Sequence, residues 1–272
     1  MDSDRWAIQG TDPGPDLNLR PIPRVIPCLL IEDEGMVKTI KFKDPTYLGD
    51  AINIINLFNR FEVDEIVLLD IRATQRRQPP PFALIERLAS ECWVPLAYGG
   101  GIRTFDDIRT ILRIGVEKVV LGKVAADDPQ IIVKAAESFG SQAVVVSVDT
   151  RPRSGGRYEV FAESGTRSLK TDPVTYAQRV EGLGAGEIFL NAIHRDGVMD
   201  GFDLALIKSV TEAVRIPVIA CGGASTRADI PLPVKLAGAA AVAAGSIFVY
   251  RGRERGVLVN FPERAQLESL FD

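Results

Sequence analysis

Three aspartates in this chain follow apolar runs and are the first candidates for chemistry. Asp70 ends IVLLD, Asp149 ends VVVSVD, and Asp196 follows FLNAIHR. A carboxylate after an apolar run is typical of a buried strand that points an acid–base group into a site at its carboxyl end. The alternative is helix capping or loop hydrogen bonding. Residue types leave both interpretations open for Asp70 and Asp196, and favour chemistry for Asp149.

Two glycine pairs predict a second kind of site, one that binds phosphate. Gly99-Gly100 follows VPLAY and Gly222-Gly223 follows PVIAC, an offset of 222 − 99 = 123 residues. Backbone N–H groups at such turns are free of side-chain bulk, and a following helix N-terminus adds partial positive charge. A single pair could simply make a tight turn. Two pairs in register predict a ligand with two phosphates, or two similar anions, across one site.

The segments after each glycine pair keep the same spacing. Gly122-Lys123 follows VVL and Gly245-Ser246 follows VAA, again 245 − 122 = 123 residues apart. Lys123 could add a positive charge to the first phosphate site, or could be a solvated lysine at a helix start. The self-similarity predicts two equivalent halves that face each other across one mouth.

The elements that must position these residues form a repeating pattern. Eight near-continuous apolar segments alternate with amphipathic stretches such as FDDIRTILRIG and PVTYAQRVEGLG, as expected for parallel strands buried on both faces. The segments are RVIPCLLI, EIVLLDI, VPLAYGG, EKVVLG, AVVVSVD, EIFLNAI, PVIACGG and AAVAAGS. Eight such units predict a (β/α)₈ TIM barrel built as two half-barrel repeats. An open doubly wound sheet is the alternative, but it would not need the internal repeat.

Composition limits the function further. The chain has 272 residues, a net charge of −4 and one histidine, His194, which we interpret as a loop hydrogen-bonding residue. The acidic balance argues against nucleic-acid binding, and no apolar window is long enough to span a membrane. Three scattered cysteines fit a reducing cytoplasm. Metal-ligand spacing is lacking, and we expect neither a metal nor another cofactor.

The chain divides into two expected parts. Residues 1–23 are rich in Asp, Pro and Gly and predict a flexible N-terminal arm, and residues 24–272 predict a single barrel. The segment TQRRQPPPF, residues 74–82, predicts a loop that covers or borders the active face.

Four charged residues lie at the opposite ends of the predicted strands. They are Arg24, Glu65, Lys118 and Glu187, each at or just before the start of an apolar run. Two pairs of opposite sign could ring the barrel axis there. From composition alone, ordinary surface charge is the simpler interpretation.

Taken together, these motifs resemble the cyclase subunit of imidazole glycerol phosphate synthase. The resemblance rests on IPCL, MVKTIKF, YGGGIR, GSQAVVVSVD, FLNAIHRDG, CGGA and AAGSIF, in this order along the chain. It implies a half-barrel duplication that binds a bisphosphorylated ribonucleotide at its mouth. It also implies a glutaminase subunit docked at the N-terminal barrel face, with ammonia passing through the barrel.

The resemblance assigns roles to individual residues. Lys38 matches the lysine of the catalytic loop, and Asp149 matches one of two essential aspartates. The positions that match the phosphate sites are Gly100, Gly101, Gly222, Gly223 and Ser246. We expect Lys123, Ser164, Asp196 and Gly245 to bind substrate or phosphate beside them. The charged residues implied for the ammonia gate are Arg24, Glu65, Lys118 and Glu187.

One departure bears directly on function. Leu30 stands where the cyclase has its second essential aspartate. Leucine cannot transfer a proton, and a general acid or base typically contributes about 10²–10⁴-fold to rate. Val198 also replaces a threonine, and Gly122-Lys123 replaces Asn-Thr.

With these departures, the chain looks more like the glycosyl amidation-associated proteins, a branch of the same superfamily. The resemblance includes VKTIKFK, YLGDAIN and the tail RGVLVNFP. It implies an ammonia-channelling barrel that works with a glutaminase, and with a sugar amidotransferase, on a surface-polysaccharide sugar. The alternatives are a working cyclase of histidine biosynthesis, with Asp70 or Glu32 replacing the missing carboxylate, and a barrel that binds a phosphorylated metabolite without turnover.

Overall fold

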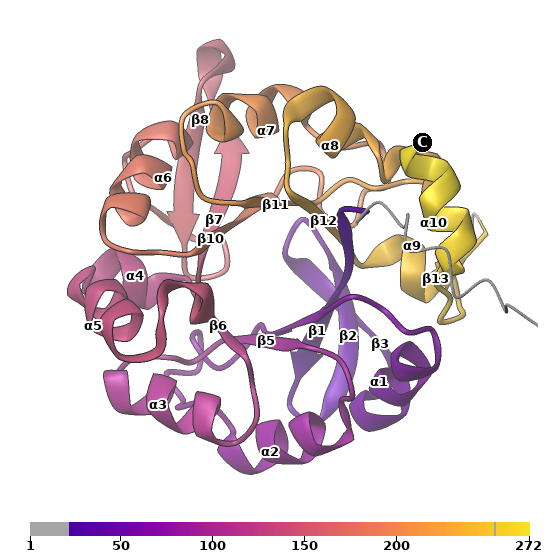
Figure 1. Ribbon diagram of the computed structural model, residues 1–272, viewed down its shortest axis with the longest axis horizontal. Helices are drawn as coiled ribbons and strands as arrows, with labels where there is room; N and C mark the ends of the chain where they lie inside the picture. The colour runs from indigo at the N-terminus through magenta and orange to yellow at the C-terminus, as the bar shows by residue number, and fades with distance from the viewer. Residues whose placement is uncertain (1–21, 253) are drawn as a thin grey trace, which may run out of the picture.

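Eight parallel strands form a closed barrel in the computed structural model, which describes residues 22–252 and 254–272 (Figure 1). Around the barrel the order is β1, β4, β5, β6, β7, β10, β11, β12, and β12 pairs with β1. The predicted (β/α)₈ barrel is therefore confirmed. Its strands are β1 (Arg24–Glu32), β4 (Ile66–Asp70), β5 (Leu96–Gly99), β6 (Lys118–Leu121), β7 (Val144–Pro152), β10 (Glu187–Ala192), β11 (Val218–Cys221) and β12 (Ala241–Ala244).

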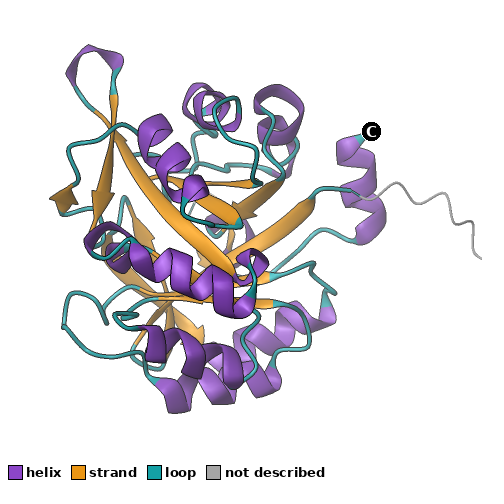
Figure 2. Cartoon of the chain, turned by 60° about the vertical axis from the view of Figure 1, so that its left-hand side comes forward, coloured by secondary structure: helices purple, strands orange, loops and turns teal. Residues whose placement is uncertain are grey.

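Helices surround the strands, as the two views in Figures 1 and 2 show. Local sequence signals set their starts: Thr104 and Asp107 form a capping box on α3, and Asp172 caps α6 with Pro173 at its first turn. The helices are α1 (Ala51–Arg60), α2 (Phe82–Glu91), α3 (Phe105–Arg113), α4 (Lys123–Asp127), α5 (Gln130–Phe139), α6 (Pro173–Gly182), α7 (Leu204–Thr211), α8 (Leu232–Ala237), α9 (Ser246–Val249) and α10 (Arg264–Phe271), with 3₁₀ turns η1 (Ser141–Ala143), η2 (Ser154–Gly156) and η3 (Arg227–Asp229). No helix in the described part of the chain is long and apolar enough to cross a membrane.

Additional strands extend the barrel at its carboxyl-terminal mouth. β1 continues into an antiparallel hairpin with β2 and β3, and β7 pairs in the same way with β8. These strands, with a small separate hairpin near the C-terminus, are β2 (Gly35–Ile40), β3 (Lys43–Asp50), β8 (Tyr158–Ala162), β9 (Arg167–Ser168), β13 (Tyr250–Arg251) and β14 (Gly256–Val257).

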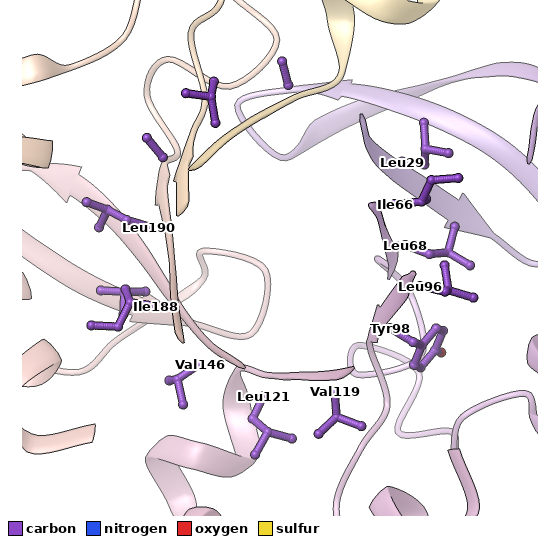
Figure 3. Packing of buried hydrophobic residues seen from close by; sticks show 14 of the residues in the cluster. Leu29, Ile66, Leu68, Leu96, Tyr98, Val119, Leu121, Val146, Ile188 and Leu190 are labelled. Atoms are coloured by element: carbon purple, nitrogen blue, oxygen red, sulfur yellow. The ribbon is translucent and has the colours of Figure 1, made fainter. Parts of the chain in front are cut away.

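Alternation along each strand divides the apolar residues into two cores. In β1, Val25, Leu29 and Ile31 belong to the core between strands and helices, whereas Ile26 and Cys28 belong to a second core inside the barrel. Figure 3 shows the outer set, with the labelled side chains pointing away from the barrel axis toward the helices. Both faces of each barrel strand are therefore buried among apolar side chains, which is why the strand segments are almost continuously hydrophobic in sequence.

The internal repeat is visible in the backbone. β6 and β12 start at residues 118 and 241, and 241 − 118 = 123, the offset seen in the sequence. Gly100 and Gly223 keep that offset and have φ angles of 126° and 116°. A residue with a Cβ atom would be strained at these positive φ angles, so glycine is needed at both positions. The division into an arm and one barrel domain stays a prediction, since residues 1–21 lie outside the described residues.

Candidate functional site

A cavity of about 180 Å³ opens at the carboxyl ends of the strands. Its floor includes Leu30, Asp149 and Asn191, which face the barrel interior. The β2–β3 hairpin and residues Thr74 and Gln75 of the loop after β4 form part of its wall, as expected for segment 74–82. The sequence-predicted acid–base residues therefore share one cavity at the mouth.

Asp149 is the carboxylate whose ionisation the site perturbs most clearly. Burial raises the pKa of Asp149 to about 7, the nearby negative charge of Asp196 adds to this, and a hydrogen bond from Ser147 opposes it. That bond joins Ser147 Oγ to Asp149 Oδ1 at 3.0 Å. A carboxyl group with a pKa near neutrality can both accept and return a proton at cellular pH.

Lys38 and Asp196 form a buried ion pair beside Asp149. Lys38 Nζ lies 2.8 Å from Asp196 Oδ1, and Thr39 Oγ1 donates to Asp196 Oδ2 at 3.3 Å. Burial disfavours the charged lysine, but the carboxylate of Asp196 outweighs it and raises the pKa of Lys38. Lys38 was expected on an open loop. Instead it lies in β2, because the chain turns back over the barrel mouth as a hairpin.

Leu30 occupies the position opposite this polar group. Its side chain is buried and lines the cavity, so no carboxylate stands there. The two carboxylates that could have replaced it are already engaged. Asp70 Oδ1 accepts the backbone N–H groups of Arg72 and Ala73 at 2.9 Å each, and Glu32 Oε1 accepts from Arg72 Nε at 2.7 Å.

The first glycine pair lies in an acidic part of the mouth. Gly100 and Gly101 line the cavity, but the N–H of Gly101 donates to Thr74 Oγ1 at 3.4 Å. Lys123 is paired with Asp127 and with Glu163, the latter at 3.5 Å, so its charge is already compensated. The cavity lining carries five carboxylates, Asp44, Asp70, Asp149, Glu163 and Asp196, against Lys43, Arg72 and Lys123.

Ser164 lies on the same side of the mouth and also lines the cavity. Its hydroxyl donates to the carbonyl of Ile71 at 3.5 Å, and its φ of 54° places it in a tight turn after β8. Because that bond is long, the hydroxyl could instead donate to an anion bound in the cavity.

The second glycine pair is packed tightly against backbone. A Cβ on Gly223 would lie 2.2 Å from the carbonyl oxygen of Gly201, and one on Gly222 would lie 2.9 Å from that of Ala192. A Cβ on Gly245 would lie 2.8 Å from the carbonyl oxygen of Cys28 and 3.1 Å from the side-chain atom Lys38 Cε. Ser246, at the start of α9, is buried and its Oγ has no hydrogen-bond partner among the described residues. A bound anion would satisfy that hydroxyl.

At the opposite end of the barrel the four predicted gate residues form a closed ring. Lys118 Nζ lies 2.9 Å from both Glu65 Oε2 and Glu187 Oε2, and Arg24 pairs with the same two carboxylates. Partial burial disfavours the charge of Arg24, but Glu187 and Glu65 outweigh it and raise the pKa of Arg24. Glu65 and Glu187 are buried and each contacts both cations, so the interpretation of these four residues as ordinary surface charge is wrong.

Sequence reasoning did not select two polar residues of the site. Ser147 holds Asp149, and Asn191 Oδ1 is buried in the cavity floor with no partner among the described residues. Ser147 lies two residues before Asp149 on β7, and Asn191 pairs with Asp149 from the neighbouring strand β10. Period-two counting back from Asp149 could have found Ser147. His194, in contrast, lies outside the cavity lining, with Nε2 3.1 Å from Asp203.

Comparison with known proteins agrees with this arrangement. The family model described as "Histidine biosynthesis protein" matches residues 24–254. The chain belongs to this family. A Pseudomonas aeruginosa protein named "Putative imidazole glycerol phosphate synthase subunit hisF2" is 49% identical over 245 residues, covering 90% of this chain and 98% of that one. Similarly named proteins of Leptospira interrogans and Vibrio vulnificus, the latter hisF3, are each 42% identical over 250 residues, with 92% of this chain and 98% and 96% of theirs covered.

Proposed function

We propose that this chain is an ammonia-conducting barrel that works with a glutaminase in the amidation of a surface-polysaccharide sugar. One contrast supports this most: the charged ring of Arg24, Glu65, Lys118 and Glu187 is intact, whereas the mouth has leucine at residue 30. A barrel that had lost all use of ammonia would not need the ring. The resemblance to glycosyl amidation-associated proteins points to the sugar.

The barrel interior is suited to neutral ammonia. Between the ring and the mouth the inner core is apolar and rich in small side chains: Ile26, Val67, Ala97, Val120, Val145, Phe189, Ile219, Ala241 and Ala243. Ammonium would pay the desolvation cost of a charge in such a lining, while ammonia would not. The ring is the natural docking point for the glutaminase, since its paired charges lie on the barrel axis and must separate to admit the molecule.

A second candidate is the cyclase of imidazole glycerol phosphate synthase. Two observations favour it: Asp149 has a pKa of about 7, and Lys38 is held in place by Asp196. The names of the relatives refer to the same enzyme. Against it, Leu30 removes one partner of the acid–base pair, and Asp70 and Glu32 are bound elsewhere.

A direct assay separates the two candidates. The purified protein is given the ring-opened ribonucleotide substrate of the cyclase with excess ammonium salt at alkaline pH, beside the Leu30→Asp variant. We expect no consumption by the natural protein, and measurable turnover by the variant if the missing carboxylate is the main difference. Turnover by the natural protein at a rate typical of enzymes, about 1 s⁻¹ or faster, would refute the amidation proposal.

The glutaminase partnership is tested at the ring. Co-expressed glutaminase should co-purify with the natural protein, and Lys118→Glu should abolish this because three carboxylates would then face one arginine. Lys134→Glu, an exposed residue of α5, is the matched control and should leave the complex intact. If both variants retain the glutaminase equally, the ring is not its docking point.

A further inference from the structure

A second cleft opens beside the second glycine pair and is lined by arginine. Its volume is about 870 Å³, within the usual range for small-molecule sites and too large for a single phosphate. Three arginines line it, Arg227, Arg251 and Arg255, and no carboxylate of the described residues does. Its other lining residues are Val198, Met199, Ser225, Thr226, Ile247, Tyr250, Gly252, Leu258 and Asn260.

Two of the three guanidinium groups are held by neutral groups. Arg227 donates to Gln266 Oε1 at 3.1 Å and to Asn260 Oδ1 at 3.4 Å. Arg255 donates to the carbonyl of Gly197 at 2.8 Å and lies over the ring of Tyr250, 5.9 Å from its centroid. Within residues 22–252 and 254–272, none of the three has a carboxylate within salt-bridge distance. These contacts fix the position of two of the charges without neutralising them.

Asp229, in the turn that carries Arg227, is already engaged with backbone. Asp229 Oδ2 accepts the N–H groups of Ser225 and Thr226, at 2.9 and 2.8 Å, and so closes the turn that carries Arg227. Several other cations at the mouth are paired with carboxylates: Arg72, Arg76, Lys123, Arg153 and Arg167. The three arginines of the cleft differ from these in having no such partner among the described residues.

We propose that this arginine cleft binds the diphosphate group of a small molecule, either free pyrophosphate or a nucleoside diphosphate. Three arginines that converge on one cleft repel one another, and a compact ligand with about three negative charges would relieve this. Guanidinium groups also match phosphate oxygens geometrically. A carboxylate or a single phosphate would leave at least one arginine uncompensated. The apolar side chains of Val198, Met199 and Leu258 offer a wall for the uncharged part of a nucleoside diphosphate.

Gly223 and Ser246, where a phosphate position was predicted, do not line the cleft, whereas Ser225 and Ile247 do. Val198 stands where the cyclase has a threonine. Val198 lines the cleft rather than the central cavity, so the substitution changes this second region and leaves the acid–base residues untouched.

Calorimetric titration with inorganic pyrophosphate at low salt is the first test, followed by ADP, AMP and orthophosphate. We expect pyrophosphate and ADP to bind at least tenfold more tightly than orthophosphate and AMP. Arg251→Gln should weaken pyrophosphate binding by tenfold or more, and its exposed side chain makes it unlikely to disturb the fold. Arg227→Gln should act in the same way. Arg60→Gln, an exposed arginine at the end of α1, is the matched control and should change nothing.

Other outcomes overturn the proposal. Absence of pyrophosphate binding would do so, and so would equal losses in Arg251→Gln and Arg60→Gln, which would indicate a general charge effect. Binding that survives Arg251→Gln and Arg227→Gln but is lost in Gly223→Ala would place the ligand at the glycine pair instead. Tighter binding of ADP than of pyrophosphate would identify the nucleoside diphosphate as the source, and the reverse would identify free pyrophosphate.

Discussion

Replacing Asp149 with asparagine should change how the stability of the protein depends on pH. The pKa of Asp149 is raised from 3.8 to about 7, chiefly by burial. Between these values the folded protein holds a proton that the unfolded chain releases, so Asp149 makes stability fall as pH rises from about 4 to about 7. Asparagine has nearly the same shape, can accept the hydrogen bond from Ser147, and does not titrate.

The magnitude follows from the shift. Each unit of pKa difference is worth about 1.4 kcal/mol, so raising the pH from 5 to 8 costs the natural protein at most about 2.7 kcal/mol at this residue. Asp149 borders a cavity that solvent can enter, which reduces the penalty. We therefore expect the free energy of unfolding of Asp149→Asn, relative to the natural protein, to increase by about 1–2 kcal/mol over this range.

The assay is urea unfolding followed by circular dichroism at pH 5, 6, 7 and 8. Glu137→Gln is the matched control, since Glu137 is an exposed residue of α5, and its difference from the natural protein should stay constant. A constant difference for Asp149→Asn as well would refute the reasoning. The carboxyl group would then be ionised throughout, and its surroundings more polar than the packing around it indicates.

Three further predictions concern single residues. Leu30→Asp should lower the free energy of unfolding at pH 8 by about 1–3 kcal/mol, measured by urea unfolding, because it places a second carboxylate in a buried position across the cavity from Asp149; no loss would mean that the floor is well hydrated. Glu65→Gln should cost about 3–5 kcal/mol in the same measurement, because Lys118 and Arg24 would share one remaining carboxylate; a change below 1 kcal/mol would show that the ring is solvated. Gly223→Ala should lower stability by more than about 2 kcal/mol, since its Cβ would clash with backbone, whereas Gly155→Ala, also at positive φ but with open space, should cost about 1 kcal/mol; equal losses would rule out the clash.

Much of the site follows from two sequence periods. Alternation along the strands places Arg24, Ile26, Cys28 and Leu30 on one inner line, and the 123-residue repeat relates Gly100 to Gly223. The partner of Lys38 could not be read in this way. It depends on the β2–β3 hairpin turning back across the mouth, and a register shift between Lys38 and Ile40 affects where the lysine points. Sequence patterns do not fix such an irregularity.

Ion pairs are a second feature that the sequence predicts only in part. The sequence identified Lys123 as a candidate phosphate ligand because it follows a glycine at a strand end. In the folded chain it is paired with Asp127 and Glu163, while Arg227, Arg251 and Arg255, which the sequence did not single out, line a cleft at the other half of the mouth. Residue type and spacing give the sign of a charge but not its neighbours, which come from segments distant in the chain.

By itself, the sequence determined the closed barrel, its two halves, the four charged residues at the starts of strands and the leucine at the end of the first strand. These follow because strand period and repeat length are local properties that any closed barrel must obey. The tertiary structure alone decided which charges are satisfied and which remain available. That depends on distances between loops far apart in sequence, and a shift of a few ångströms changes an ion pair into a binding site.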